Sequence, residues 1–303
     1  MLYPDFSELM KLQAASMFCN LNTHYKRTSL VHGDYTSFFK GHGMEFEAVR
    51  PYVIGDDVRY VDWRVTARTC KPHIKTFQAE CDQKILLVID ANPHMYFGTR
   101  GTFKSIQAAR AAAILSGIAF RNRDRVGGLI FGTCKSEFQF FPPARQRSMV
   151  CQLLKILSKQ PKKNIYLSKS SINSSLRYLY QNLPIGALIF LISDIDAFVS
   201  ADPLYFAKIR KKAKLVLLPV IDPIDEHLPN AGALTCLGEG NEKLYITMHS
   251  KTFRQHYQTL WHEQCNKFIK LVKKYRLNLI FLRTDEPVQR ALNLGLKRLK
   301  KHW

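Results

Sequence analysis

The run KILLVID, residues 84–90, decides the fold of this chain of 303 residues. It is almost continuously apolar and ends in Asp90, which is the pattern of a strand covered on both faces in a parallel sheet. Alanine and leucine at helical spacing follow in residues 103–121, and RVGGLIFG at 125–132 is the next apolar run. The order strand, helix, strand predicts a crossover unit of an α/β protein.

The same alternation continues toward the end of the chain. Further strands are predicted by the apolar runs ALIFLISD at 187–194, KLVLLPVID at 214–222 and LNLIFLR at 277–283. Helical spacing is present in the segments 147–159, 172–182, 202–212, 251–275 and 288–300. We therefore predict a doubly wound, mostly parallel sheet with helices on both faces. Such a sheet binds ligands at the carboxyl ends of its strands, where the sequence places Asp90, Asp194 and Asp222.

The first part of the chain has a different residue pattern. Residues 5–17 have helical spacing, and residues 45–78 are rich in β-branched and aromatic residues interrupted by proline and glycine, which predicts short strands and turns. We predict two domains, an N-terminal helix with a β-rich appendage in residues 1–82 and the α/β domain in residues 83–303. Residues 223–242 lack a clear pattern and are expected to form a long loop.

Composition limits the class of protein. A hydrophobic content of 46% is enough for a large core, and the net charge of +21 favours phosphate-rich surfaces or acidic proteins as partners. The seven cysteines are scattered and never spaced C-x-x-C, so neither a disulfide framework nor a zinc knuckle is indicated. No signal-peptide pattern and no membrane-spanning apolar run is found. We expect a cytoplasmic protein, with a peripheral position at the inner face of the membrane as the alternative.

The segment GHGMEFEAVRPYVIGDDVRYVDWRVTAR, residues 41–68, alternates arginines with carboxylates. Guanidinium and carboxylate groups this close in sequence readily form bidentate pairs. Such a network either fixes the appendage or supplies acid/base or partner-docking groups. The candidate network consists of Arg50, Asp56, Asp57, Arg59, Asp62, Trp63 and Arg68.

This segment resembles the signature of the von Willebrand factor A-like proteins of domain-of-unknown-function family 58. DRVG at 124–127 and DPIDEHLP from residue 222 extend the resemblance to about residue 230. The resemblance implies a von Willebrand factor A-like sheet with an N-terminal β-rich element. It also implies chaperone-like work on a client protein beside a MoxR-type AAA+ ATPase, and no established reaction.

The resemblance further implies a metal-ion-dependent adhesion site, in which the first strand ends in D-x-S-x-S and its oxygen atoms hold Mg²⁺. This chain keeps Asp90 but has Asn92 and His94 in place of the two serines, and a histidine nitrogen is a poor ligand for Mg²⁺. We expect a degraded site that binds Mg²⁺ weakly at most, with Asp90, Asn92 and Asp194 as candidate ligands. Otherwise Asp90 caps loop amides. Three serines are candidates for the missing hydroxyl: Ser170, Ser171 and Ser174.

Familiar catalytic motifs are missing. GTRGTFKS at 98–105 fails the phosphate-binding pattern because Gly101 stands three residues before Lys104, and no H-E-x-x-H pair is present. We predict a non-catalytic adaptor or assembly factor that binds an acidic partner, a MoxR-type ATPase or its client, through Asp90, His94 and Asp194.

Two other functions stay open. Basic runs at 208–214, 270–276 and 297–303 suit helix ends but also fit nucleic acid or an anionic membrane surface. The grouped carboxylates permit a metal-dependent phosphohydrolase.

Overall fold

The computed structural model describes residues 4–18, 44–79, 83–133, 136–159, 172–229, 233–237, 243–247 and 250–299. The chain divides into two compact units. Residues 27–82 form one, which we call the hairpin unit, and residues 1–26 and 83–303 form the other, the sheet unit.

The sheet unit is built on a sheet with the strand order β10-β7-β6-β3-β4-β5, and β11 also pairs with β7. All neighbours are parallel except β4 and β5, and the order reverses at β3, so that the ends of β3 and β6 lie side by side. The predicted α/β fold with a mostly parallel sheet is confirmed. The strands are β3 (Lys84–Asp90), β4 (Arg125–Thr133), β5 (Ser136–Ala144), β6 (Leu188–Ser193), β7 (Lys214–Ile221), β10 (Asn278–Leu279) and β11 (Leu282–Arg283).

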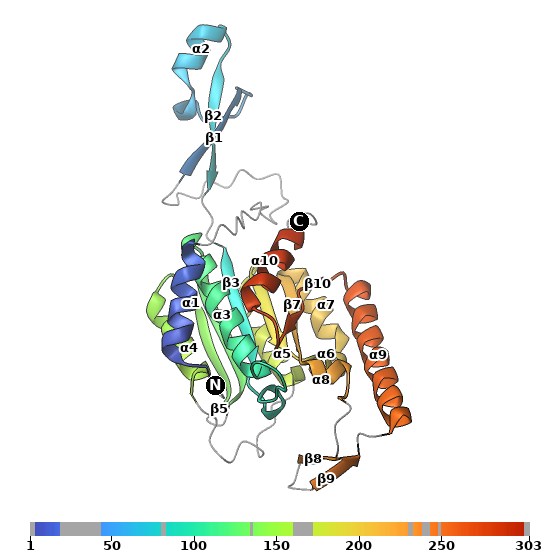
Figure 1. Ribbon diagram of the computed structural model, residues 1–303. Helices are drawn as coiled ribbons and strands as arrows, with labels where there is room; N and C mark the ends of the chain where they lie inside the picture. The colour runs from blue at the N-terminus through green and yellow to red at the C-terminus, as the bar shows by residue number, and fades with distance from the viewer. Residues whose placement is uncertain are drawn as a thin grey trace. The chain divides into compact units, whose positions relative to one another are not determined.

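Helices cover both faces of this sheet because the buried strands direct alternate apolar side chains to opposite sides (Figure 1). In β3, Ile85 and Ile89 join the core on one face, while Leu86 and Val88 join the core on the other. The first face carries α1 (Phe6–Phe18), α3 (Lys104–Arg121), α4 (Arg147–Leu157) and α10 (Val288–Leu299). The second carries α5 (Ile172–Gln181), α6 (Ile195–Ser200), α7 (Pro203–Lys212) and α9 (Lys251–Lys274).

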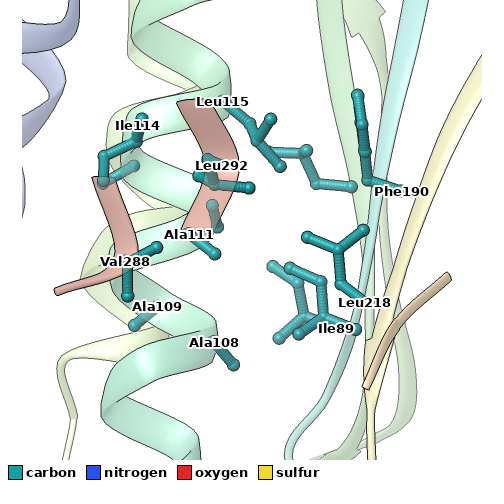
Figure 2. Close-up of a cluster of buried hydrophobic side chains, with 14 of the residues drawn as sticks. Ile89, Ala108, Ala109, Ala111, Ile114, Leu115, Phe190, Leu218, Val288 and Leu292 are labelled. Atoms are coloured by element: carbon teal, nitrogen blue, oxygen red, sulfur yellow. The ribbon is translucent and has the colours of Figure 1, made fainter. Parts of the chain in front are cut away.

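Helix α3 lies close to the sheet because alanines line its inner side. Figure 2 shows Ala108 and Ala111 opposite the strand residues Ile89, Phe190 and Leu218, and all five are buried. Small side chains on the helix let long ones on the strands fill the interface at the density of a protein interior.

The first helix belongs to the sheet unit, and its placement with the appendage in residues 1–82 is corrected here. Helix α1 packs on α3, where Gln13 Nε2 donates to Ser116 Oγ at 3.1 Å and Arg110 pairs with Glu8 at 2.7 Å. The approach is so close that a Cβ atom on Gly117 would lie 2.2 Å from the carbonyl oxygen of Gln13. Tertiary packing of this kind leaves no mark on the periodicity of α1 itself.

Several elements differ from the predicted ones. Strand β5 at the antiparallel edge was not predicted, and its two prolines are tolerated because an edge strand needs fewer backbone donors. The expected long loop at 223–242 contains the helix α8 (Pro223–Glu226) and the hairpin strand β8 (Ala233–Leu237), which pairs with β9 (Lys243–Thr247). The run LNLIFLR gives two short strands instead of one.

The hairpin unit consists of β1 (Met44–Pro51) paired antiparallel with β2 (His73–Ala79). The connection contains a 3₁₀ turn at Val58–Tyr60 and the helix α2 (Trp63–Thr69). Helix α2 was not predicted, and Asp62 starts it by accepting hydrogen bonds from the two amides of Arg64 and Val65. The β-branched residues of WRVTART hide this short helix from a propensity argument.

Gly117→Ala is expected to lower the free energy of unfolding by about 1–3 kcal/mol, because the added methyl group forces α1 away from α3. Urea unfolding of the full chain measures this. Ala15→Ser on the exposed side of α1 is the control and should change the value by less than about 0.5 kcal/mol. Equal stability of Gly117→Ala and the wild type would contradict the placement of α1.

Candidate functional site

Three aspartates stand where the parallel strands β3, β6 and β7 end. Asp90 and Asp222 are 1% and 0% exposed, and Asp194 is also buried. Because the strands are neighbours, the carboxylates share one edge of the sheet, as the order of the sequence predicts. Asp194 accepts from the amide of Ala197 at 2.8 Å and caps α6, and Asp222 accepts from the amide of Ile224 at 3.1 Å and caps α8.

The Asp90 carboxylate is fully engaged inside the protein. Its Oδ1 accepts from the backbone amide and the side-chain amide of Asn92, at 2.9 and 2.7 Å. Its Oδ2 accepts from Ser193 Oγ at 2.5 Å and lies 3.1 Å from Nε2 of His94. Gly132 on the neighbouring strand has φ +79° and no room for a Cβ beside Asn92, which keeps that side chain against Asp90.

His94 joins two of the three carboxylates. Its Nε2 lies 3.7 Å from Asp194 Oδ2 in addition to its contact with Asp90, and the side chain is 33% exposed. Burial lowers the pKa of His94, as does Lys104, but the hydrogen bond to Asp90 and the charges of Asp90 and Asp194 outweigh both. The net pKa is therefore above the ordinary value of 6.5, which favours the protonated ring.

The candidate metal ligands Asp90, Asn92 and Asp194 do come together, but they are occupied by one another and by His94. In the described residues, no group of three or more His, Cys, Asp or Glu side chains is arranged to hold a metal ion. Ser174 lies on α5, and the other two candidate serines are outside the described residues. This arrangement does not fit an octahedral Mg²⁺ site.

Asp222 ties three segments together at the same edge. Its Oδ2 accepts from the amide of Thr99 at 2.9 Å and from Thr284 Oγ1 at 2.6 Å, and its Oδ1 also accepts from the Thr99 hydroxyl. Burial raises the pKa of Asp222, but the hydrogen bonds from Thr284 and Thr99 lower this pKa by a larger amount. The net pKa therefore lies below 3.8. Sequence reasoning found Asp222 and missed both threonines, which lie in loops without a recognisable motif.

Other polar residues of the edge are also paired. Lys104 Nζ contacts Asp225 Oδ2 at 2.8 Å, which explains why the lysine of GTRGTFKS is not available as a phosphate ligand. Gln107 Nε2 donates to the carbonyl oxygens of residues 283, 284 and 286. Arg283 NH1 contacts both carboxylate oxygens of Glu226, at 2.9 and 2.8 Å. The edge is a continuous polar network.

The accessible part of this edge carries both signs of charge. Asp196, Asp285 and Glu286 are exposed there next to half-buried Glu226, but Arg283 pairs with Asp285 and Glu226, and Arg100 is exposed beside Thr99. Docking of an acidic partner through Asp90, His94 and Asp194, which the sequence led us to expect, stays a prediction. Asp90 also has almost no exposed surface to offer, so any contribution to binding passes through His94.

Part of the predicted arginine and carboxylate network forms in the hairpin unit. Arg50 makes a bidentate pair with Asp56 at 2.8 and 2.6 Å, and the side-chain hydrogen bond from Arg50 lowers the pKa of Asp56. Arg59 pairs with Asp57 in the same way, with a shortest distance of 2.6 Å between nitrogen and oxygen. These pairs brace the turn that follows β1.

The rest of that candidate set does not join the network. Asp62 caps α2 and lies 3.7 Å from Lys75 Nζ. Trp63 is 68% exposed, so it does not belong to the core of the hairpin unit. Arg68 is exposed and has no ion pair within the described part of the chain. Sequence reasoning therefore chose the right segment but not the role of its exposed residues.

The connection between β1 and β2 displays large apolar side chains. Ile54 is 97% exposed, and Val53, Val58 and Trp63 are each more than half exposed. Arg64 and Arg68 on α2 are exposed beside them in sequence. We call these six residues the hairpin tip.

Comparison with known proteins assigns the family. The family described as "Protein of unknown function DUF58" matches residues 48–267. The chain belongs to the DUF58 family. The matched region contains the hairpin tip and the three edge aspartates of this DUF58 protein.

Similar proteins add names but no activity. The DUF58 chain is 37% identical over 120 residues to the uncharacterized proteins Rv1480 of Mycobacterium tuberculosis and Mb1516 of Mycobacterium bovis. That match covers 40% of this chain and 38% of each relative. A crystal structure of the conserved hypothetical protein BatB from Bacteroides thetaiotaomicron aligns with 72% of the chain and 99% of its own, at 14% identity and a TM-score of 0.39. Among the described helices, none has the length and apolarity needed to cross a membrane.

Asp222→Asn is expected to lower the free energy of unfolding by about 2–4 kcal/mol at neutral pH, because it removes a buried, fully bonded charge. Since the folded-state pKa lies below 3.8, this contribution is complete above that value and is lost as the pH falls through the folded pKa. The difference from the wild type should thus narrow only below pH 3.8, in urea unfolding at a series of pH values.

Glu263→Gln provides the control for this experiment. Glu263 is an exposed carboxylate of α9, and its replacement should change the free energy of unfolding by less than about 0.5 kcal/mol. If the wild type and Asp222→Asn had the same free energy of unfolding at neutral pH, the hydrogen bonds assigned to Asp222 would be contradicted.

Proposed function

We propose that this DUF58 protein is a non-catalytic adaptor in the cytoplasm that binds a protein partner through the hairpin tip, the partner being a MoxR-type AAA+ ATPase or its client. The observation that carries the proposal is the exposure of Val53, Ile54, Val58 and Trp63 in one short connection. Exposed apolar residues gathered in this way mark interaction surfaces, whereas single ones need no explanation.

The energetics favour a contact through this connection. Burying an aliphatic or aromatic side chain contributes about 1.5–3 kcal/mol, and tryptophan and arginine are the residue types most often found at binding hot spots. The hairpin unit buries Val61 and Ile74, so it has its own small core and does not need the tip residues for it.

Charge indicates the kind of partner. Arg64 and Arg68 are exposed and form no ion pair with any described residue, so carboxylates of a partner can reach them. At the sheet edge, Arg283 is instead already paired with Glu226 and Asp285. The two exposed arginines of the hairpin tip therefore suit an acidic partner.

The absence of catalysis is part of the proposal. Acid/base or metal chemistry needs carboxylates that can reach a substrate, whereas Asp90 and Asp222 are covered and hold donors of their own chain. The same reasoning weighs against a metal-dependent phosphohydrolase. A von Willebrand factor A-like fold is proposed with the adaptor role, and the strand order with one antiparallel edge strand supports it.

The test uses the purified chain and a purified MoxR-type AAA+ ATPase from the same organism. Ile54→Ala with Trp63→Ala is expected to weaken binding by at least about tenfold, because each removes part of an apolar side chain that the partner would bury. Calorimetric titration measures the affinity. Ile185→Ala is the matched control, since Ile185 is 77% exposed in the sheet unit, and it should bind like the wild type.

Two results would count against the proposal. One is unchanged affinity of the double variant for an ATPase that does bind the wild type. The other is equal weakening by Ile185→Ala, which would indicate general stickiness of apolar surface rather than a docking site.

One observation favours nucleic acid as a second candidate partner. Helices α7 and α9 cover the same face of the sheet, and both expose cations there, which are Lys208, Arg210, Lys211, Lys267, Lys270, Lys273 and Lys274. The third basic run, at 297–303, lies largely outside the described residues.

This candidate predicts binding of a DNA oligonucleotide whose log affinity falls linearly with log salt. Replacing Lys270 and Lys273 by glutamate should weaken binding and reduce the slope by roughly one for each phosphate that the chain no longer neutralises. Fluorescence anisotropy measures both. Lys11→Glu on α1, at the opposite face, is the control, and no binding at low salt would remove the candidate.

A further inference from the structure

The strongest unexplained feature of the sheet edge is a histidine between two buried carboxylates. Nε2 of His94 lies 3.1 Å from Asp90 Oδ2 and 3.7 Å from Asp194 Oδ2. We propose that the His94 imidazole fills the gap between Asp90 and Asp194, so that the residues present there do not fit a metal ion, and that removing the imidazole opens a divalent-cation site. This inference is independent of the proposed partner.

Two buried carboxylates lie on neighbouring strands at this edge. Two carboxylates that end adjacent strands repel each other, and burial strengthens the repulsion because water no longer screens it. The other donors to Asp90 are the neutral groups of Asn92 and Ser193, and Asp194 receives the neutral amide of Ala197. Among the described residues, His94 is the side chain that contacts both carboxylates.

Another buried cation of this edge is already paired with a different carboxylate. Lys104 is buried and contacts Asp225 at 2.8 Å, and Asp225 in turn accepts from the amide of Asp222 at 2.8 Å. Moving the ammonium group to Asp90 would leave Asp225 without its cation.

The backbone holds the ring in place before any ligand arrives. His94 is the middle residue of the 3₁₀ turn Pro93–Met95, in which Pro93 fixes the entry and the amide of Met95 donates to the Asn92 carbonyl at 3.0 Å. The Met95 side chain is fully buried and anchors the turn. An imidazole fixed in this way costs little further entropy when it pairs with the carboxylates.

The same geometry explains why Mg²⁺ does not compete. The ion binds oxygen at about 2.0–2.1 Å in an octahedron that usually retains several waters. The ring fills the gap between the two carboxylate oxygens, so a hydrated ion would first have to expel a side chain held in the same loop. Without the ring, the gap offers two carboxylates, which is the number that Mg²⁺ often uses in proteins.

Replacement of His94 by serine tests the inference, with Mn²⁺ and Mg²⁺ as probes of the full-length chain. The wild type should show no change of melting temperature with Mg²⁺. His94→Ser should melt lower without metal and rise by about 2–4 °C when Mg²⁺ is present at roughly ten times its Kd. Electron paramagnetic resonance of Mn²⁺ should show at least about tenfold tighter binding by His94→Ser than by the wild type.

Two further variants distinguish metal binding between Asp90 and Asp194 from nonspecific metal binding. His94→Ser combined with Asp194→Asn should lose the gained metal response, because one of the two carboxylates is gone. His256→Ser, at an exposed position of α9, should remain unresponsive like the wild type. If His94→Ser does not fold in the absence of metal, His94→Gln keeps most of the side-chain volume and is used in its place.

The inference is overturned by either of two results. The first is Mn²⁺ binding by the wild type that Asp194→Asn abolishes, which would mean that the histidine does not close the site. The second is a folded His94→Ser or His94→Gln protein that binds Mn²⁺ no better than the wild type.

Discussion

Three carboxylates buried at the ends of adjacent parallel strands impose the main constraint on this structure. A buried charge without donors costs several kcal/mol, roughly the size of a domain's net stability, so Asp90, Asp194 and Asp222 must each be satisfied within the fold. Each is satisfied in a different way: by an imidazole, by the amino end of α6, and by hydroxyls from two distant loops. The loops at this edge are held where they are because these donors are needed there.

This constraint separates the roles of the two units. At the edge of the sheet unit, polar side chains turn inward and neutralise one another, as Lys104 does with Asp225 and Arg283 with Glu226. The hairpin unit does the opposite, since its ion pairs brace a turn from which Ile54 and Trp63 project into solvent. A network that is already satisfied has little free energy to gain from a partner, whereas an exposed apolar side chain gains on burial.

The strands and helices that depend on the periodicity of apolar residues could be predicted from the sequence. Continuous apolar runs such as KILLVID identify buried parallel strands, and the alternation with helices determines that their aspartates share an edge. Contacts between distant segments leave no such trace. The placement of α1 depends on the missing side chain of Gly117, and the bonding of Asp222 depends on Thr99 and Thr284, which no motif connects. The sequence leaves open whether Trp63 packs in a core or lies at an interface, and only the fold shows that its ring is exposed.

His94 illustrates how a residue that weakens a metal site can itself fill the space of the metal ion. Read as a row of ligands, aspartate, asparagine and histidine form a poor Mg²⁺ site. In three dimensions, the asparagine donates to the aspartate and the histidine side chain lies between two carboxylates, so the place of a metal ion is filled by the chain itself. A side chain of the chain itself cannot diffuse away, and its presence does not depend on the concentration of free metal. The geometry of this edge is therefore set by folding alone.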